Sequence, residues 1–390
     1  MDYGFDRVID RNNTNCVKFD MAKKHGMPEG ILPMWVADMD FMAPPSTLEA
    51  LKNFVDYGIF GYSFMGDDYF NALEGWFREN HGWEVSREWV STTPGVVFAL
   101  SAAIRAVTQK GDAVMIQPPV YPPFYEVIER NERKKVENTL VYENGKYSID
   151  FEDMEKKIAE NDVKLMILCS PHNPVGRVWT VDELQKVGSI CRKYNVTVVS
   201  DEIHCDFAFP DHPHTPFVKA CPEMMEQAIV CTAPSKTFNL AGLQVSNIFV
   251  PGEQLRARFR KVMGECFYGE PNCLGMLACQ AAYQGGKDWL ENCKAYMREN
   301  LAYMRKFLQE NIPQIKVVEP EGTYLVWLDC SGLGLSKQEL YDLFAYKAKV
   351  WVDNGDIFGE VGAQFIRVVL ASPRETVRKA MEQLKKAIDG

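Results

Sequence analysis

Lys236 is the residue whose type and setting best suit covalent chemistry. It follows Ser235 in a run of small residues, and the apolar residues Ala228 to Cys231 just before it predict a buried strand. A lysine at the end of such a strand has a depressed pKa, so its amine becomes a usable nucleophile for a carbonyl carbon. Most lysines, however, lie in surface loops. The chemical role of Lys236 therefore depends on whether other residues supply partners for it.

Tyr121, Asn173 and Asp201 each follow a predicted strand. These strands are expected over residues 113–116, 164–169 and 196–199, in that order. Prolines on both sides hold Tyr121 rigidly, so its ring could stack on a flat heterocycle, although a tyrosine buried under a loop is a fair alternative. Burying Asp201 is costly without a cation, and a protonated pyridine nitrogen would be such a cation.

A helix start and two hydroxyl groups are candidates for holding a phosphate. A strand predicted over residues 88–91 leads through a Thr-Pro-Gly turn into a predicted helix over residues 96–107. The free N–H groups of Val96 and Val97 would face an anion, helped by the helix dipole, although every strand-to-helix turn offers such a start. Ser235 is a second candidate. Tyr62 lies in an aromatic, glycine-bearing loop, where it either packs in a core or reaches a phosphate.

Two residues are candidates for contact with a substrate. Arg367 lies inside the apolar strand predicted for Phe365 to Val369, and a buried arginine requires a carboxylate, either from a substrate or from an internal salt bridge. Ala37 lies in the apolar but irregular run Leu32 to Phe41. That run is either an arm packed on another domain or subunit, or a segment whose backbone lines the pocket.

The predicted elements alternate between strands and helices, and the candidate residues come just after strands, which is typical of a parallel α/β sheet that binds ligands at its carboxyl edge. From Ile315 onward the chain instead reads as an α+β unit, whose last helix we expect to be capped by Ser372 with Pro373 at its first position. We therefore expect an N-terminal arm over residues 1–45, a large domain over residues 46–285 and a small domain over residues 286–390.

The composition excludes several classes of protein. The chain has 390 residues, 46% of them hydrophobic, and a formal charge of −10 without a basic block, so we expect no nucleic-acid partner. No apolar run reaches the length of a membrane span and no secretory signal is present, so no membrane is expected. The 11 cysteines lack a Cys-x-x-Cys pair, which favours reduced thiols in the cytoplasm. His204, His212 and His214 lack a complete metal-ligand pattern, so no metal is expected.

Taken together, these residues make the sequence resemble the fold-type-I enzymes that depend on pyridoxal 5'-phosphate (PLP), the aspartate-aminotransferase superfamily. More narrowly, it is similar to the carbon–sulfur β-lyases of the MalY/PatB type, which act as cystathionine β-lyases. The resemblance runs nearly from end to end, through residues 32–41, 60–62, 117–124, 170–180, 200–204, 233–243, 321–329 and 365–369.

The resemblance implies a role for each candidate residue. Lys236 would hold PLP and then shuttle protons, Asp201 would pair with the ring nitrogen, Asn173 would bind the ring oxygen, and Tyr121 would stack on the ring. Val96, Val97 and Ser235 would bind the phosphate, with Tyr62 reaching in from the other subunit of a homodimer. Arg367 would clamp the substrate carboxylate near Ala37. His204 lies close to the cofactor in this scheme, but its role stays open.

The resemblance also implies a reaction. A lyase of this type eliminates a thiol from cystathionine or a cysteine-type substrate and leaves pyruvate and ammonia. An aminotransferase on the same scaffold is the alternative, and a regulatory protein that keeps PLP as a structural ligand is a more distant one. Many aminotransferases have a phosphate-binding arginine eight residues after the lysine, whereas this chain has Gln244 there. That difference favours the lyase.

Overall fold

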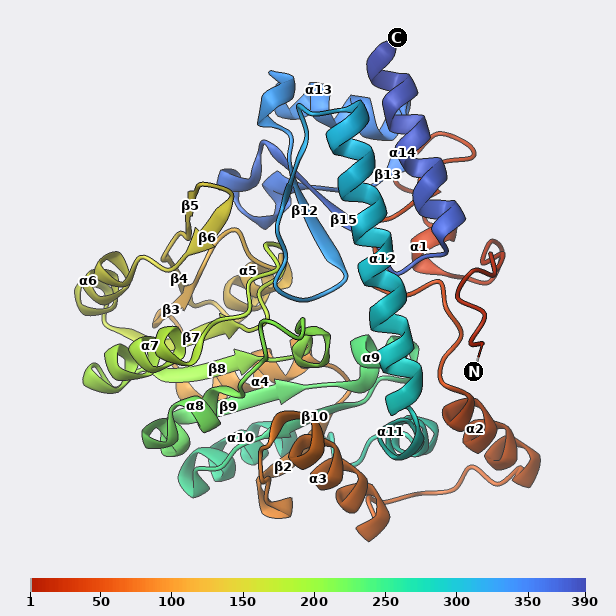
Figure 1. Cartoon of the computed structure of the whole chain (residues 1–390). Coiled ribbons are helices and arrows are strands. Elements are labelled where there is room, and N and C mark those ends of the chain that lie inside the picture. Colours follow the sequence, from red (N-terminus) through yellow and green to blue (C-terminus); the bar gives the residue numbers. More distant parts are fainter. Residues whose placement is uncertain (1) are drawn as a thin grey trace. The chain divides into compact units, whose positions relative to one another are not determined.

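The structure is a computed structural model that describes residues 2–390, and its chain forms two compact units (Figure 1). The central unit contains Ala43–Asn173 and Arg177–Leu290. The terminal unit contains the residues up to Met42 together with Pro174–Gly176 and Glu291–Gly390. The N-terminal arm thus belongs to the same unit as the C-terminal part of the chain.

The central unit is built on a seven-stranded sheet with the order β2-β10-β9-β8-β7-β3-β4. All neighbouring strands are parallel except β10, which is antiparallel to both β2 and β9. The strands are β2 (Val90–Thr93), β3 (Ala113–Ile116), β4 (Lys134–Glu137), β7 (Val163–Cys169), β8 (Thr197–Asp201), β9 (Ala228–Thr232) and β10 (Ser246–Phe249). A separate hairpin joins β5 (Val141–Glu143) and β6 (Lys146–Ser148). The α/β fold expected from the sequence is confirmed.

Helices cover this sheet because its inner strands are apolar on both faces. Every residue of β8 and β9 is buried, as expected for parallel strands that are covered on both sides. One hydrophobic core joins these strands to α4, α5 and α10, and α4 lies behind the strands in Figure 1. The helices of this unit are α2 (Pro45–Tyr57), α3 (Asp67–His81), α4 (Val96–Val107), α5 (Pro123–Arg130), α6 (Phe151–Asn161), α7 (Val181–Lys193), α8 (Phe217–Ala220), α9 (Pro234–Thr237), α10 (Glu253–Glu265) and α11 (Cys273–Gly285).

The terminal unit contains a four-stranded antiparallel sheet with the order β11-β12-β15-β14. Its strands are β11 (Lys316–Val318), β12 (Leu325–Asp329), β14 (Asp353–Asn354) and β15 (Phe365–Val369). A short parallel pair joins β1 (Leu32–Pro33) of the arm to β13 (Val350–Trp351). The helices are α1 (Val17–Asp20), α13 (Lys337–Asp342) and α14 (Arg374–Asp389), while α12 (Lys287–Asn311) begins in the central unit and continues into this one.

Most predicted strands and helices are present near their expected bounds, with three differences. The strand expected over residues 88–91 is β2 at Val90–Thr93, because Arg87–Trp89 form a 3₁₀ turn, η1. Helix α13 is regular only to Asp342, and a π-helical turn follows over Leu343–Lys347. The expected Ser372 cap of the last helix is wrong, because α14 begins after Pro373 and the Ser372 hydroxyl instead donates to Asp40 Oδ2 at 2.7 Å. The Ser372 hydroxyl therefore bonds a tertiary acceptor, Asp40, and does not accept from the N–H donors at the start of the helix.

The Asp40 carboxylate joins two cations of the arm, and its bond with Ser372 links the arm to the C-terminal part of the same unit. The ammonium group of Lys18, which is fully buried, lies 3.0 Å from Asp40 Oδ2, and Arg11 Nη1 lies 2.7 Å from Asp40 Oδ1. Arg11 also bonds Asp38 through Nη2 at 2.7 Å. Because these cations hold both Asp38 and Asp40, the run from Leu32 to Phe41 has a defined path within its own unit.

The cysteines and the helix lengths bear on the environment of the chain. All 11 cysteines are free thiols. Among residues 2–390, none of the helices has the length and apolar character required to span a lipid bilayer.

Candidate active site

Most of the residues singled out in the sequence come to one edge of the central sheet. Strands β3, β7, β8 and β9 are parallel, and β2 has the same direction because β2 and β9 both pair antiparallel with β10. Their carboxyl ends therefore lie at a common edge. The candidate residues follow these strand ends in turn: Val96 after β2, Tyr121 after β3, Asn173 after β7, Asp201 at the end of β8 and Lys236 after β9.

Asp201 is a buried carboxyl group, with 4% of its surface exposed. Burial raises the pKa of Asp201 to about 7, while the Ile203 N–H, which donates to Oδ1 at 3.1 Å, and the charge of Lys236 both lower it. Asp201 ends β8 and Lys236 follows the neighbouring parallel strand β9, so the two residues lie at the same edge of the sheet. A further cation beside Asp201 would lower this pKa and so favour the ionised carboxylate.

Lys236 lies in a single helical turn, α9, whereas its run of small residues had suggested a loop. Pro234 opens α9, and the Phe238 N–H donates to the Pro234 carbonyl at 2.9 Å. The turn ends where Asn239 adopts a left-handed φ of 59°. Ser235 and Lys236 are half-buried, whereas the next residue, Thr237, is buried.

Tyr121 and Asn173 lie on two loops that a histidine connects. The Nε2 atom of His172 is 2.9 Å from the carbonyl oxygen of Pro119. Burial lowers the pKa of His172 to about 4, so the ring is neutral near pH 7 and donates Nε2–H to that carbonyl. The sequence reasoning missed this residue, although its position immediately before Asn173 was a usable signal.

The phosphate candidates at the start of α4 lie in a suitable local geometry. The first bond of the helical ladder runs from Ala99 N to Gly95 O at 3.2 Å, so the N–H groups of Val96 and Val97 precede that ladder. A Cβ atom built on Gly95 would have no neighbour within 4 Å, which indicates open space beside these N–H groups. Gln244, at the position where many aminotransferases have an arginine, is exposed and has a φ of 51°.

Some buried oxygens at the edge of the sheet have no partner among the described residues. They belong to Thr92, which lies in β2, and to Gln117 and Ser170, which follow β3 and β7: Oγ1 of Thr92, Oε1 of Gln117 and Oγ of Ser170. A buried oxygen of this kind normally has a partner, so these three oxygens are available to a water molecule or a polar ligand.

Glu202 is a second buried carboxylate beside Asp201 that the sequence reasoning missed. It accepts hydrogen bonds from Ser200 Oγ at 2.9 Å and from Phe217 N at 2.8 Å, and it pairs with His214 Nε2 at 2.9 Å. Its charge contributes to the raised pKa of Asp201. His204, whose role the sequence left open, is buried at the start of the 3₁₀ turn η2 (Cys205–Phe207).

Tyr62 lies in the irregular segment between α2 and α3. The neighbouring residues Ile59, Phe60 and Phe64 are more than half exposed, and Tyr62 itself is fully exposed. The alternative of a core tyrosine is therefore wrong for the single chain. Whether a second subunit covers Tyr62 stays a prediction.

Arg367 and Ala37 belong to the terminal unit. The guanidinium of Arg367 is buried; its Nη2 pairs with the carboxylate of Asp353 on the adjacent strand β14 and donates to the Trp35 carbonyl at 3.0 Å. Burial raises the pKa of Asp353, and Arg367 opposes that rise. The internal salt bridge considered from the sequence is thus present. The carbonyl of Ala37 accepts a hydrogen bond from the Tyr324 hydroxyl at 3.0 Å, which fixes this stretch of backbone.

Comparisons with known proteins agree with this arrangement. The family model described as aminotransferase class I and II matches residues 31–384. The chain is 41% identical to cystathionine β-lyase PatB of Bacillus subtilis (strain 168) over 98% of this chain and 99% of that protein.

Two solved structures are also similar. A PLP-bound protein of Clostridium difficile 630, assigned in its description to the aminotransferases, is 42% identical, with a TM-score of 0.96 over 99% of this chain and 100% of the other. A C–S lyase of Staphylococcus hominis, PLP-bound and complexed with L-cycloserine, is 33% identical, with a TM-score of 0.94 over 100% of this chain and 98% of the other.

Proposed function

Because the chain belongs to the class I and II aminotransferase family, we propose that it is a PLP-dependent carbon–sulfur β-lyase. The observation that carries the proposal is the similarity, along nearly the whole chain, to a cystathionine β-lyase. The reaction is the α,β-elimination of cystathionine or a cysteine-type substrate. It gives a thiol, such as homocysteine or sulfide, together with pyruvate and ammonia.

Three features of the central unit support a fit to PLP. The buried carboxyl of Asp201, with its raised pKa, is suited to a cationic ring nitrogen. The open space at Gly95 beside the free N–H groups of α4 is suited to a phosphate. The oxygens of Gln117 and Ser170 without partners lie just beyond β3 and β7, at the edge to which the candidate residues converge.

Each residue then has a defined task. Lys236 would bind the aldehyde carbon of the cofactor and would later take the α-proton of the substrate on Nζ. Asp201 would hold the ring nitrogen, Asn173 the ring oxygen, and Tyr121 would cover one face of the ring. Val96, Val97 and Ser235 would hold the phosphate, and His204 is a further cofactor-binding candidate.

The substrate is held by residues of the terminal unit. Arg367 binds the α-carboxylate through guanidinium N–H groups, since its fork offers five donors and Asp353 pairs with Nη2. Ala37, whose carbonyl accepts from Tyr324 of the same unit, is the second candidate for contact with the substrate. The expected division into residues 1–45, 46–285 and 286–390 stays our working description of the domains.

PLP supplies an electron sink for the electron pair that remains when the α-proton is removed. Lys236 Nζ takes this proton, and the thiolate leaves Cβ with the electrons of the C–S bond. Hydrolysis of the remaining three-carbon fragment gives pyruvate and ammonia. An aminotransferase would instead return the proton to the cofactor, and a solved relative described as an aminotransferase makes this the second candidate.

The exposed aromatic segment around Tyr62 supports a homodimer in which Tyr62 reaches the partner's active site, because a chain rarely leaves so many large apolar side chains in water. The free cysteines support a reducing cytoplasm as the location.

The experiment that tests the function follows the products of both candidate reactions at once. The purified enzyme is incubated with cystathionine in the absence of any 2-oxo acid, and pyruvate, free thiol and pyridoxamine phosphate are measured over time. We expect many turnovers with equal amounts of pyruvate and thiol. Alanine, which has no leaving group on Cβ, is the control substrate and should give no thiol. Conversion of the cofactor to pyridoxamine phosphate in one turnover, with little thiol, would make the enzyme an aminotransferase.

A further inference from the structure

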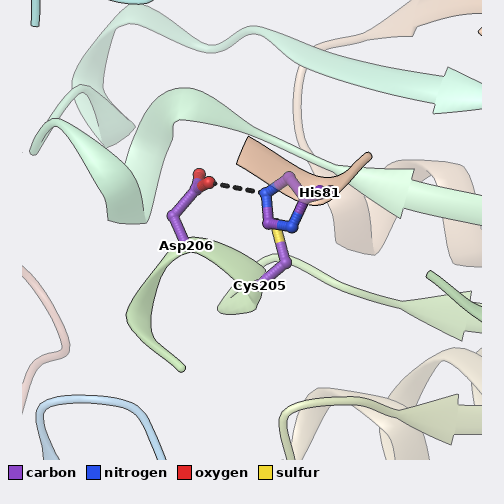
Figure 2. A group of neighbouring side chains, drawn as sticks. All are labelled: His81, Cys205 and Asp206. Carbon is purple, nitrogen blue, oxygen red and sulfur yellow. Dashed lines mark hydrogen bonds and ion pairs between the residues drawn. The ribbon is translucent and has the colours of Figure 1, made fainter. Parts of the chain in front are cut away.

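Next to the candidate active site, His81, Cys205 and Asp206 form a buried cluster (Figure 2). Their possible metal-ligand atoms lie within 4.8 Å of one another. Figure 2 shows the Asp206 carboxylate directed at the imidazole of His81, with the sulfur of Cys205 near the same ring. His81 ends α3, while Cys205 and Asp206 lie in η2, just after β8 and Asp201.

Hydrogen bonds already engage both carboxylate oxygens of Asp206. Oδ1 accepts from Trp76 Nε1 at 3.0 Å and pairs with His81 Nε2 at 2.9 Å. Oδ2 accepts from the Thr237 hydroxyl at 2.6 Å. Burial raises the pKa of Asp206, but the interactions with His81, Thr237 and Trp76 outweigh burial and hold that pKa below its usual value. The carboxylate is therefore ionised and well matched by donors.

These partners favour a structural role for Asp206 over a metal site. We call the hydrogen bonds of Asp206 with His81, Trp76 and Thr237 the anchor. Both oxygens of Asp206 already accept hydrogen bonds, so a metal would have to displace His81 from Oδ1 or Thr237 from Oδ2. The donors on Asp206 come from α3 and α9, so the carboxylate joins those two helices.

The hydroxyl of Thr237 matters because Thr237 follows Lys236 directly. Helix α9 has only 4 residues, and so short a helix is not stable by itself. The next residue, Phe238, packs edge-on against Trp76 with ring centroids 5.3 Å apart, and Trp76 stacks on Tyr283 at 5.2 Å. The two residues after Lys236 are thus both held, one by Asp206 and one by the Trp76 ring.

We propose that Asp206 is a positioning residue for Lys236: through Thr237 it fixes the one-turn helix that carries the lysine. The proposal rests on the proposed function, in which Lys236 moves the substrate proton. A displaced amine loses its alignment with the α-carbon, and small misplacements of a reacting group cost about a hundredfold in rate. The substrate carboxylate is bound by Arg367 and not by this helix. The lower rate should therefore appear in kcat, with little change in KM.

The test compares Thr237→Val with Thr237→Ser in the full-length PLP-bound enzyme. Valine has the shape of threonine without the hydroxyl, whereas serine keeps the hydroxyl and lacks only the methyl group. We expect Thr237→Val to lower kcat about ten- to a hundredfold with KM within about twofold, and Thr237→Ser to keep kcat within about threefold of the wild type. Ile158→Ala, which opens a buried position in α6, controls for a general loss of stability.

A second readout does not depend on turnover. In the cofactor-free protein, hydrogen exchange at the amides of Phe238 and Leu240, which bond to Pro234 and Ser235 at 2.9 and 3.1 Å, should be at least tenfold faster in Thr237→Val than in the wild type. Exchange in β9 should be unchanged. If Thr237→Val does not fold, Thr237→Ala is measured in the same way.

The outcomes separate this proposal from the proposed function. Reduction with borohydride should label Lys236 in both variants. Label on another lysine would refute the role of Lys236, whereas label on Lys236 with an unchanged kcat and exchange rate in Thr237→Val would refute the anchor alone. Equal losses in Thr237→Val and Thr237→Ser would also refute it. A stoichiometric metal that Cys205→Ser abolishes would make the cluster a metal site and overturn the proposal.

Discussion

Replacing Asp201 by asparagine is expected to abolish activity and yet to stabilise the cofactor-free protein above pH 7. Burial raises the pKa of Asp201 from 3.8 to about 7. Above pH 7 the folded chain must therefore keep a carboxylate ionised where ionisation is unfavourable, whereas the unfolded chain ionises it freely. The difference corresponds to about 4 kcal/mol at most. Asparagine is close in shape, keeps an oxygen for the Ile203 N–H and removes the charge.

The pH dependence has a definite sign. Because the folded pKa lies above the unfolded value, the contribution of Asp201 to stability is present below pH 3.8 and is lost as the pH rises to about 7. The difference in unfolding free energy between Asp201→Asn and the wild type should grow over that interval and stay level above it. It is measured by urea unfolding of the cofactor-free proteins between pH 5 and 8.

A nearby aspartate provides the matched control. The pKa of Asp206 is lowered because its interactions with His81, Thr237 and Trp76 outweigh burial, so Asp206→Asn should destabilise the same protein at pH 8. PLP should stabilise the wild type more than Asp201→Asn, since only the wild type offers a carboxylate to the ring nitrogen. A less stable Asp201→Asn at pH 8, or full activity in that variant, would contradict our account of this site.

Replacing Arg367 by lysine is expected to raise KM more than tenfold while PLP stays bound. Lysine keeps the positive charge but lacks the additional N–H groups, on Nε and Nη1, through which the guanidinium would reach the substrate carboxylate while Nη2 holds Asp353 and Trp35. A charge-assisted hydrogen bond contributes about 1.5–3 kcal/mol. The measurement is steady-state kinetics with cystathionine, together with the absorbance of the bound cofactor.

Asp353→Asn is the control that separates binding from structure. It keeps the shape of the partner of Arg367 but leaves the buried guanidinium without its carboxylate, which should cost about 3–5 kcal/mol of stability. KM should change little in this variant. If Arg367 serves only the internal salt bridge, Arg367→Lys and Asp353→Asn will lose similar stability and both will keep the KM of the wild type.

The sequence was sufficient to predict the elements that depend on local patterns. The apolar runs before Asn173 and Asp201 are strands β7 and β8, since parallel strands buried on both faces leave a continuous apolar signal. The capping box of Thr180 and Glu183 at the start of α7 is another local pattern, because its two hydrogen bonds join residues three apart. The ends of these strands were therefore sufficient to predict that the candidate residues lie at one edge of the sheet.

The sequence was not sufficient where a side chain finds its partner through tertiary packing. Asp206 and Thr237 lie 31 residues apart and meet only because η2 and α9 follow neighbouring strands. The partner of Arg367 depends on the register of β14 and β15. Ser372 had a good local capping pattern, but the competing bond to Asp40 was visible only in the fold.

The central claim is that Lys236 carries the cofactor at the carboxyl edge of the sheet, and chemical labelling tests it most directly. The PLP-bound protein is reduced with sodium borohydride, digested and mapped by mass spectrometry, with a Lys236→Ala variant as the control. We predict a pyridoxyl group on Lys236 in the wild type and no stoichiometric label in the variant. Stoichiometric label on any other lysine of the wild type would contradict the account.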